Sequence, residues 1–307
     1  MQSLGKRNKR EVLAIVGPKG GVGKSIISAN LSIALAQMGR KVIAVDLDLG
    51  AANLHAILGM RESKYSLDDF VFNKVRNLAD VVAETGTRNL GMISGGDVPG
   101  IANLAYQKKM KLIGHLLKLE SDVIILDLGA GASNNVIDFL IIAQRGLVVT
   151  TPEVPSLLNL YSFIKSTVFR RLAIHFKHND APELLDLLER AKDPRNNPQL
   201  KTMEGFLDQA RGINPTMAES AGRLLSGFRF LIVVNRVMKP ADANAGDVVQ
   251  NLLRQYLSIG NSATMTIRED NAVRSSMTKL TPIMIDNPSS LFCRDIVQIA
   301  TRLLSTG

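Results

Sequence analysis

A short glycine-rich segment between two apolar runs constrains this chain more than any other feature. Residues 19–25 read KGGVGKS; the apolar run 12–16 (VLAIV) precedes them, and the run 26–35 (IISANLSIAL), which suits a helix, follows them. The glycines at 20, 21 and 23 permit backbone conformations closed to other residues, so that successive N–H groups can converge on one anion. Strand, glycine-rich turn and helix in this order predict a phosphate-binding loop.

Two lysines and a serine give this loop its expected chemistry. Lys24 is placed to reach the β- and γ-phosphates of a nucleotide, and the Ser25 hydroxyl is placed to ligate Mg²⁺. The additional Lys19 marks the pattern known as the deviant Walker A motif. We therefore expect ATP and Mg²⁺ as cofactors, with nucleotide contacts from the loop residues Gly20, Gly21, Val22, Gly23, Lys24, Ser25 and Ile26.

Acidic residues end two further apolar runs. The run 41–48 (KVIAVDLD) ends in Asp46 and Asp48, whose i, i+2 spacing directs both carboxylates to the same side of a strand. The run 122–127 (DVIILD) ends in Asp127 and fits a Walker B strand, whose carboxylate holds a Mg²⁺-bound water. At the carboxyl ends of parallel strands these acids would face the ligand crevice.

In this order the motifs resemble the MinD/ParA superfamily of P-loop ATPases, and the segment 48–53 (DLGAAN) resembles its MinD/FlhG branch, FlhG being the flagellar relative of MinD. The resemblance implies that Asp48 positions or activates the attacking water and that Asp46 supports Mg²⁺. It also implies an ATP-bound homodimer, in which Lys19 crosses to the phosphates of the partner subunit and stabilises the transferring phosphoryl group.

The resemblance also suggests where the rest of the nucleotide is held. The segment 146–153 (GLVVTTPE) ends in Glu153, which faces nucleotide or the partner subunit in relatives. Another strand-like run, 230–237, carries Asn235 and Arg236, and the Asn235 amide would recognise adenine with one donor and one acceptor. The segment 266–273 (TIREDNAV) looks like the family's loop under the adenine, which brings in Glu269 and Asp270.

The implied function is an ATP-hydrolysing dimerisation switch that regulates the placement or number of a cellular structure, such as a flagellum or a division site. A protein partner, by resemblance an FlhF-type GTPase or a flagellar regulator, would stimulate hydrolysis. Two alternatives stay open. A ParA-type ATPase would partition DNA, although the 48–53 segment favours the MinD/FlhG branch. A non-hydrolysing positioning scaffold is the other, although the intact Lys19, Lys24, Asp48 and Asp127 argue against it.

Composition excludes several classes that share the loop. The single cysteine, Cys293, argues against the iron–sulfur carriers and the arsenite-pump and tail-anchor ATPases, which use cysteine pairs. The net charge of +9 favours nucleic acid or an anionic membrane as a contact, and the residues 6–10 (KRNKR) form the one compact basic cluster. With 5% aromatic residues and no tryptophan, a platform that stacks single-stranded bases is disfavoured, and no sequence-specific nucleic-acid contact is expected.

These patterns predict a doubly wound, mostly parallel α/β sheet with helices on both faces. A basic arm (1–10) would precede one P-loop domain (11–307), which carries a helical insertion at about 170–227. Without an apolar run of about 20 residues, we expect a cytoplasmic protein whose membrane association is weak or passes through a partner. The last apolar positions are expected to pack on the core: Ile296, Val297, Ile299, Ala300, Leu303 and Leu304.

Overall fold

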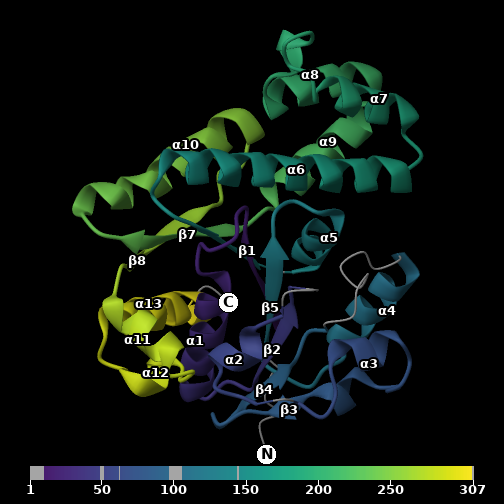
Figure 1. Ribbon diagram of the computed structural model, residues 1–307. Helices are drawn as coiled ribbons and strands as arrows, with labels where there is room; N and C mark the ends of the chain where they lie inside the picture. Colours follow the sequence, from purple (N-terminus) through teal and green to yellow (C-terminus); the bar gives the residue numbers. More distant parts are fainter. Residues whose placement is uncertain (1–9, 49–51, 62, 97–105, 144, 306–307) are drawn as a thin grey trace, which may run out of the picture.

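The computed structural model describes residues 10–48, 52–61, 63–96, 106–143 and 145–305, and it confirms the predicted α/β fold (Figure 1). Eight strands form one sheet in the order β3-β4-β2-β5-β1-β6-β7-β8. The short β3 runs antiparallel to β4, and every other pair of neighbours is parallel. The strands are β1 (Glu11–Gly17), β2 (Val42–Leu47), β3 (Ala83–Glu84), β4 (Leu90–Ile93), β5 (Val123–Ala130), β6 (Arg145–Thr150), β7 (Phe230–Val237) and β8 (Ala263–Arg268).

The strand sequences explain why the sheet is covered on both faces. In the central β1, all five residues of the VLAIV run (12–16) are at most 3% exposed. A strand that faces helices on both sides needs such a continuous apolar run, whereas a strand with one wet face alternates polar and apolar residues. The basic arm predicted for residues 1–10 lies outside the described residues except for Arg10.

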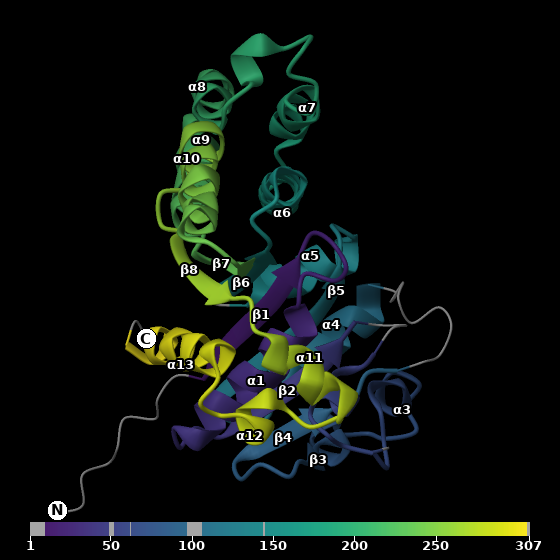
Figure 2. The same ribbon diagram turned by 60° about the vertical axis from the view of Figure 1, so that its left-hand side comes forward.

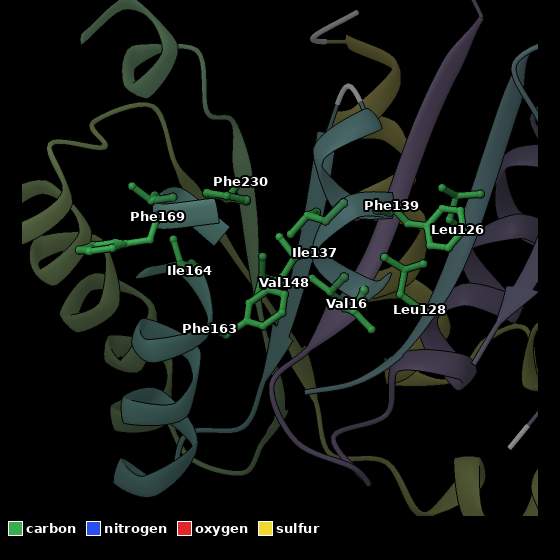
Figure 3. Close-up of a cluster of buried hydrophobic side chains, with 14 of the residues drawn as sticks. Val16, Leu126, Leu128, Ile137, Phe139, Val148, Phe163, Ile164, Phe169 and Phe230 are labelled. Carbon is green, nitrogen blue, oxygen red and sulfur yellow. The ribbon is translucent and has the colours of Figure 1, made fainter. Parts of the chain in front are cut away.

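Two helical layers bury the two faces of the sheet. One apolar core lies under α1 (Lys24–Gln37), α2 (Leu54–Ile57), α11 (Asn271–Thr278), α12 (Ile283–Asp286) and α13 (Leu291–Ser305). The other lies under α3 (Leu67–Val71), α4 (Tyr106–Leu116), α5 (Asn134–Ile142), α6 (Val154–His178) and α10 (Ala245–Leu257). Figure 3 shows part of this second core, where Phe139 of α5 lies beside Leu126 of β5 and Phe163 of α6 lies beside Val148 of β6. Short 3-10 helices are η1 (Leu78–Val81), η3 (Pro198–Leu200) and η4 (Pro240–Asn244).

Between β6 and β7 the chain forms extra helices, α7 (Pro182–Arg190), α8 (Met203–Ile213) and α9 (Pro215–Ser226). Together with α6 and α10 they stand above the sheet as two adjacent stacks (Figure 2). The Phe176 and Phe206 rings, with centroids 6.2 Å apart, join α6 to α8. Because the buried side chains of α7–α9 belong to the same apolar cluster as the sheet, these helices extend the core of the domain.

The last helix, α13, packs as expected at most of its apolar positions. Ile296, Ile299, Ala300 and Leu303 are buried, and Leu304 packs at the edge of the same cluster. Val297 differs, since it is 38% exposed. In the part of the chain that the structure describes, none of the helices has the length and apolarity that crossing a membrane requires.

Candidate nucleotide-binding site

The predicted phosphate-binding loop joins β1 to α1. Gly21 and Gly23 have φ angles of 78° and 98°, a left-handed conformation that favours glycine. Helix α1 begins at Lys24, whose side chain is only 6% exposed, whereas Lys19 at the start of the loop is exposed. The first N–H groups of a helix have no partners within it, so this helix start offers donors to an anion.

Two buried carboxylates lie beside the loop. Asp46 of β2 and Asp127 of β5 are register partners on adjacent strands, and both are fully buried. The Ser28 hydroxyl donates to Oδ1 of Asp127 (2.8 Å). The Asp46 oxygens accept the backbone N–H groups of Asp48 (3.1 Å) and Leu54 (2.9 Å). Asp46 therefore holds the backbone at Asp48, directly after β2, and at Leu54, the first residue of α2.

Burial dominates the protonation of this pair. It raises the pKa of Asp127 to about 7, with a further upward push from the Asp46 charge, while the Ser25 and Ser28 hydroxyls and Lys24 act in the opposite direction. Burial likewise raises the pKa of Asp46 to about 6. Two neighbouring carboxylates in a dry site are difficult to ionise together unless a cation balances their charge.

The residues predicted to hold Mg²⁺ fit that ion. The buried Oδ2 of Asp127 has no hydrogen-bond partner among the described residues, although buried acceptors are normally paired. No group of three or more His, Cys, Asp or Glu side chains in the described part of the chain is arranged to hold a metal alone. Mg²⁺ typically takes one or two protein carboxylates and completes its shell with phosphate and water oxygens. Ser25, Asp127 and the neighbouring Asp46 match that donor set.

Asp48 lies at the same end of the sheet, above Gly129. A Cβ atom at Gly129 would be 2.8 Å from Oδ1 of Asp48, so glycine is what allows this close approach. Burial raises the pKa of Asp48, and the Lys24 charge opposes the shift. Asp48 and Lys24 therefore interact electrostatically on the phosphate side of the site.

Asn235, predicted to recognise adenine, is bound to the phosphate-binding loop. Its Nδ2 donates to the carbonyl oxygen of Val22 at 2.8 Å, and a Cβ atom at Gly23 would lie only 2.4 Å from the same nitrogen. The structure thus gives Asn235 a loop-holding contact, and recognition of the base stays a prediction.

Three charged residues gather at the mouth of the loop. The pKa of Glu153 is lowered by a hydrogen bond with Thr151 and, to a smaller extent, by the charges of Arg236 and Lys19. Arg236 has a left-handed backbone (φ 61°), and its Nε lies 3.9 Å from Oε2 of Glu269. Lys19, Glu153 and Arg236, from three separate segments, are therefore close enough to interact electrostatically.

Asp270, predicted near the adenine, has a structural role in this fold. Its carboxylate accepts the N–H of Ala272 (2.9 Å), which caps α11, and the N–H of Phe292 (3.2 Å) in α13. Sequence reasoning missed Ser28, which holds Asp127. Its signal was present, because Ser28 follows Lys24 by four residues and so lies on the same face of α1.

Comparison with known proteins establishes the family. The model of the CobQ/CobB/MinD/ParA nucleotide-binding domain matches residues 13–283. The chain belongs to this MinD/ParA family of nucleotide-binding ATPases.

Among curated relatives, the septum site-determining protein MinD of Helicobacter pylori is 37% identical over 148 residues, covering 48% of this chain and 54% of that protein. The antiactivator FleN of Pseudomonas aeruginosa is 34% identical over 169 residues, covering 54% of this chain and 59% of FleN. The chain thus spans little more than half the length of these relatives.

Solved structures share the fold across nearly the whole chain. MinD of Pyrococcus horikoshii with Mg-ADP has a TM-score of 0.62 at 21% identity, covering 96% of both chains. The MinC:MinD complex of Aquifex aeolicus gives 0.62 at 19%, also covering 96% of each. A ParA family ATPase of Chlorobium tepidum has a TM-score of 0.65 at 21% identity, covering 96% of this chain and 99% of that ATPase.

The contact of Asn235 with the loop leads to a stability prediction. Gly23→Ala places a Cβ 2.4 Å from the Asn235 amide on a backbone with φ 98°. We expect it to lower the free energy of unfolding of the nucleotide-free protein by about 2 kcal/mol or more. Gly20→Ala is the matched control, because its Cβ would meet nothing within 4 Å and should leave stability nearly unchanged. Urea denaturation would measure both, and equal effects would contradict the packing argument.

Proposed function

We propose that this protein is an ATP-hydrolysing dimerisation switch. Two subunits would associate when ATP and Mg²⁺ bind, and they would separate after hydrolysis. The contrast between its two loop lysines is the main support. Lys24 is buried at the helix start, where it serves the phosphates of its own subunit, whereas Lys19 is exposed at the mouth, with its charge available to a second subunit. A lysine supplied in this way would stabilise the charge on the transferring phosphoryl group, as an arginine finger does.

In this proposal the side chains on the phosphate side have two separate roles, binding Mg²⁺ and positioning the attacking water. Ser25 and Asp127 hold Mg²⁺, which, when bound, neutralises negative charge on the phosphates. Binding of the cation favours the ionised form of Asp127, whose pKa burial raises to about 7. Asp48 accepts a hydrogen bond from the attacking water and orients it. Gly129 supports this role by leaving room for the Asp48 carboxylate.

Exposed apolar side chains near the mouth support a dimer contact there. Val154 directly follows Glu153 and is 67% exposed, and Leu158, one turn later in α6, is 56% exposed. Met238, two residues beyond Arg236, is 83% exposed. Large apolar side chains that gather on a surface commonly mark a protein–protein interface.

The relatives suggest what such a switch acts on. MinD carries the name septum site-determining protein, and FleN the name antiactivator. We propose that this chain regulates the placement or number of a cellular structure, and that a protein partner stimulates its hydrolysis. The fold is also shared with a ParA family ATPase, and the net charge of +9 keeps DNA partitioning as the second candidate. ATP-dependent retention of duplex DNA in a filter assay, with a steep salt dependence, would favour that candidate.

Lys19 provides the test of the dimer. Lys19→Ala is expected to bind ATP with nearly the wild-type affinity but not to dimerise, because the charge that crosses to the second site is gone. Light scattering with ATP and Mg²⁺ would report the mass. Lys41→Ala, which removes an exposed lysine just before β2, at the strand end opposite the phosphate-binding loop, should dimerise normally. A stable ATP-bound Lys19→Ala dimer would rule out the proposed role of Lys19.

A further inference from the structure

A large groove lies away from the nucleotide loop, between α4, α5, α6 and α7 (labelled in Figure 1). Its volume of about 1140 Å³ exceeds the roughly 300–1,000 Å³ of most small-molecule sites. The groove includes Leu185 and Leu188 from the extra helices between β6 and β7, so that insertion builds one of its walls. Ala132 and Asn134, which follow Gly131, also line it.

Three helices each turn an apolar stripe toward this groove. On α6, Ala173 and Ile174 lie between Arg170 and Lys177 at helical spacing, and Ile174 is 43% exposed. Helix α5 contributes Ile137 and Ile141 at i, i+4, and α7 contributes the two leucines named above at i, i+3. A groove with an apolar floor between parallel ridges suits the apolar face of an amphipathic helix.

The charges that line the groove are strongly unbalanced. Its lining has six lysine and arginine side chains and a single carboxylate, Asp138. That carboxylate is already neutralised, because Lys109 of α4 and Arg170 of α6 both pair with it at 2.5 Å. Among the described residues, Arg171 and Lys177 have no ion-pair partner, and the Lys165 ammonium lies over the Phe169 ring, 5.4 Å from its centroid.

We propose that this groove binds an acidic, amphipathic helix of a partner protein. Leucine-like side chains of that helix would occupy the apolar floor, and its carboxylates would pair with Arg171, Lys177 and Lys165. The α6 part of the groove runs from Lys165 to His178, which corresponds to about 20 Å of helix. The bound helix would therefore have three to four turns. A nucleic acid fits less well, because a floor of isoleucine and leucine offers nothing to phosphate.

The test uses the full chain and a labelled peptide of about 15 residues, with leucine along one face of the helix and glutamate along the other. Fluorescence anisotropy should show saturable binding to the wild type. Arg171→Glu/Lys177→Glu should raise the Kd at least ~10-fold, and Ile174→Ser should raise it by a smaller factor. The control Arg254→Glu/Arg274→Glu makes the same change in charge on α10 and α11, outside the groove, and should bind as the wild type does.

Three results would overturn the proposal. The first is equal binding of a scrambled peptide of the same composition, which would reduce the effect to general charge attraction. The second is displacement of the helical peptide by duplex DNA whose own binding the same variants weaken, which would make the groove a nucleic-acid surface. The third is no binding of the helical peptide at ~1 mM to a wild-type protein that still binds nucleotide. Thermal unfolding of each variant would separate loss of binding from loss of fold.

Discussion

Lys24→Ala is expected to abolish nucleotide binding, with a Kd for ATP at least ~100-fold higher than that of the wild type, or about 3 kcal/mol. Lys19 is exposed, whereas Lys24 is the buried lysine of the loop, at 6% exposure. Its stem is held against Gly17, where a Cβ atom would lie 3.1 Å from Cγ and Cδ of Lys24. The substitution therefore removes a positioned positive charge from the site. Because hydrogen bonds between a charged donor and phosphate are stronger than those between neutral groups, we expect a large loss of affinity. Isothermal titration with ATP and Mg²⁺ would measure it.

Two controls make the Lys24 result interpretable. Lys24→Met keeps most of the side-chain stem and should lose nearly as much affinity, which would assign the effect to the charge. Thermal unfolding without nucleotide should show both variants folded, since they remove no buried ion pair found among the described residues. A Lys24→Ala protein that bound ATP within threefold of the wild type would refute the assigned role.

The features that sequence predicted best depend on local patterns. The KGGVGKS segment connects β1 to the first residues of α1, as predicted, because apolar strand, glycine turn and helical run are each recognisable over a few residues. The strand expected over residues 230–237 is β7, with those bounds. The acids at 46 and 127 are register partners because both lie toward the carboxyl ends of adjacent parallel strands. Strand β5 continues to Ala130, beyond the acid that the sequence placed at its end.

What the sequence left open depends on contacts between distant segments. Asn235 reaches the Val22 carbonyl across 213 residues of chain, and no local pattern reports that approach. The position of α13 also gives the Asp270 carboxylate the N–H of Phe292 besides that of Ala272, a contact the sequence did not indicate, and its place near the adenine stays a prediction. The groove beside α6 has the same origin, since its lining comes from helices whose packing only the fold defines.

Asp48→Ala is expected to separate binding from hydrolysis. The variant should bind ATP and Mg²⁺ normally, because Lys24, Ser25 and Asp127 remain, but it should turn over ~10²- to 10⁴-fold more slowly, the usual contribution of a positioned proton acceptor. Asp48→Ala thus differs from Lys24→Ala, which is expected to lose ATP binding itself. Phosphate release under single-turnover conditions, beside a titration of the same protein with ATP, would measure the two steps separately.

The fold explains why Asp48, and not its neighbour, should show this pattern. Both oxygens of Asp46 accept backbone N–H groups of the turn after β2, so Asp46→Ala should lower stability and nucleotide affinity together. Within the part of the chain that the structure describes, the half-buried Asp48 carboxylate accepts no backbone N–H group, and it lies over Gly129. Removing it should therefore leave the turn in place. Wild-type phosphate release by Asp48→Ala would exclude Asp48 from positioning the water, and a thermally unstable Asp48→Ala would instead give the residue a structural role.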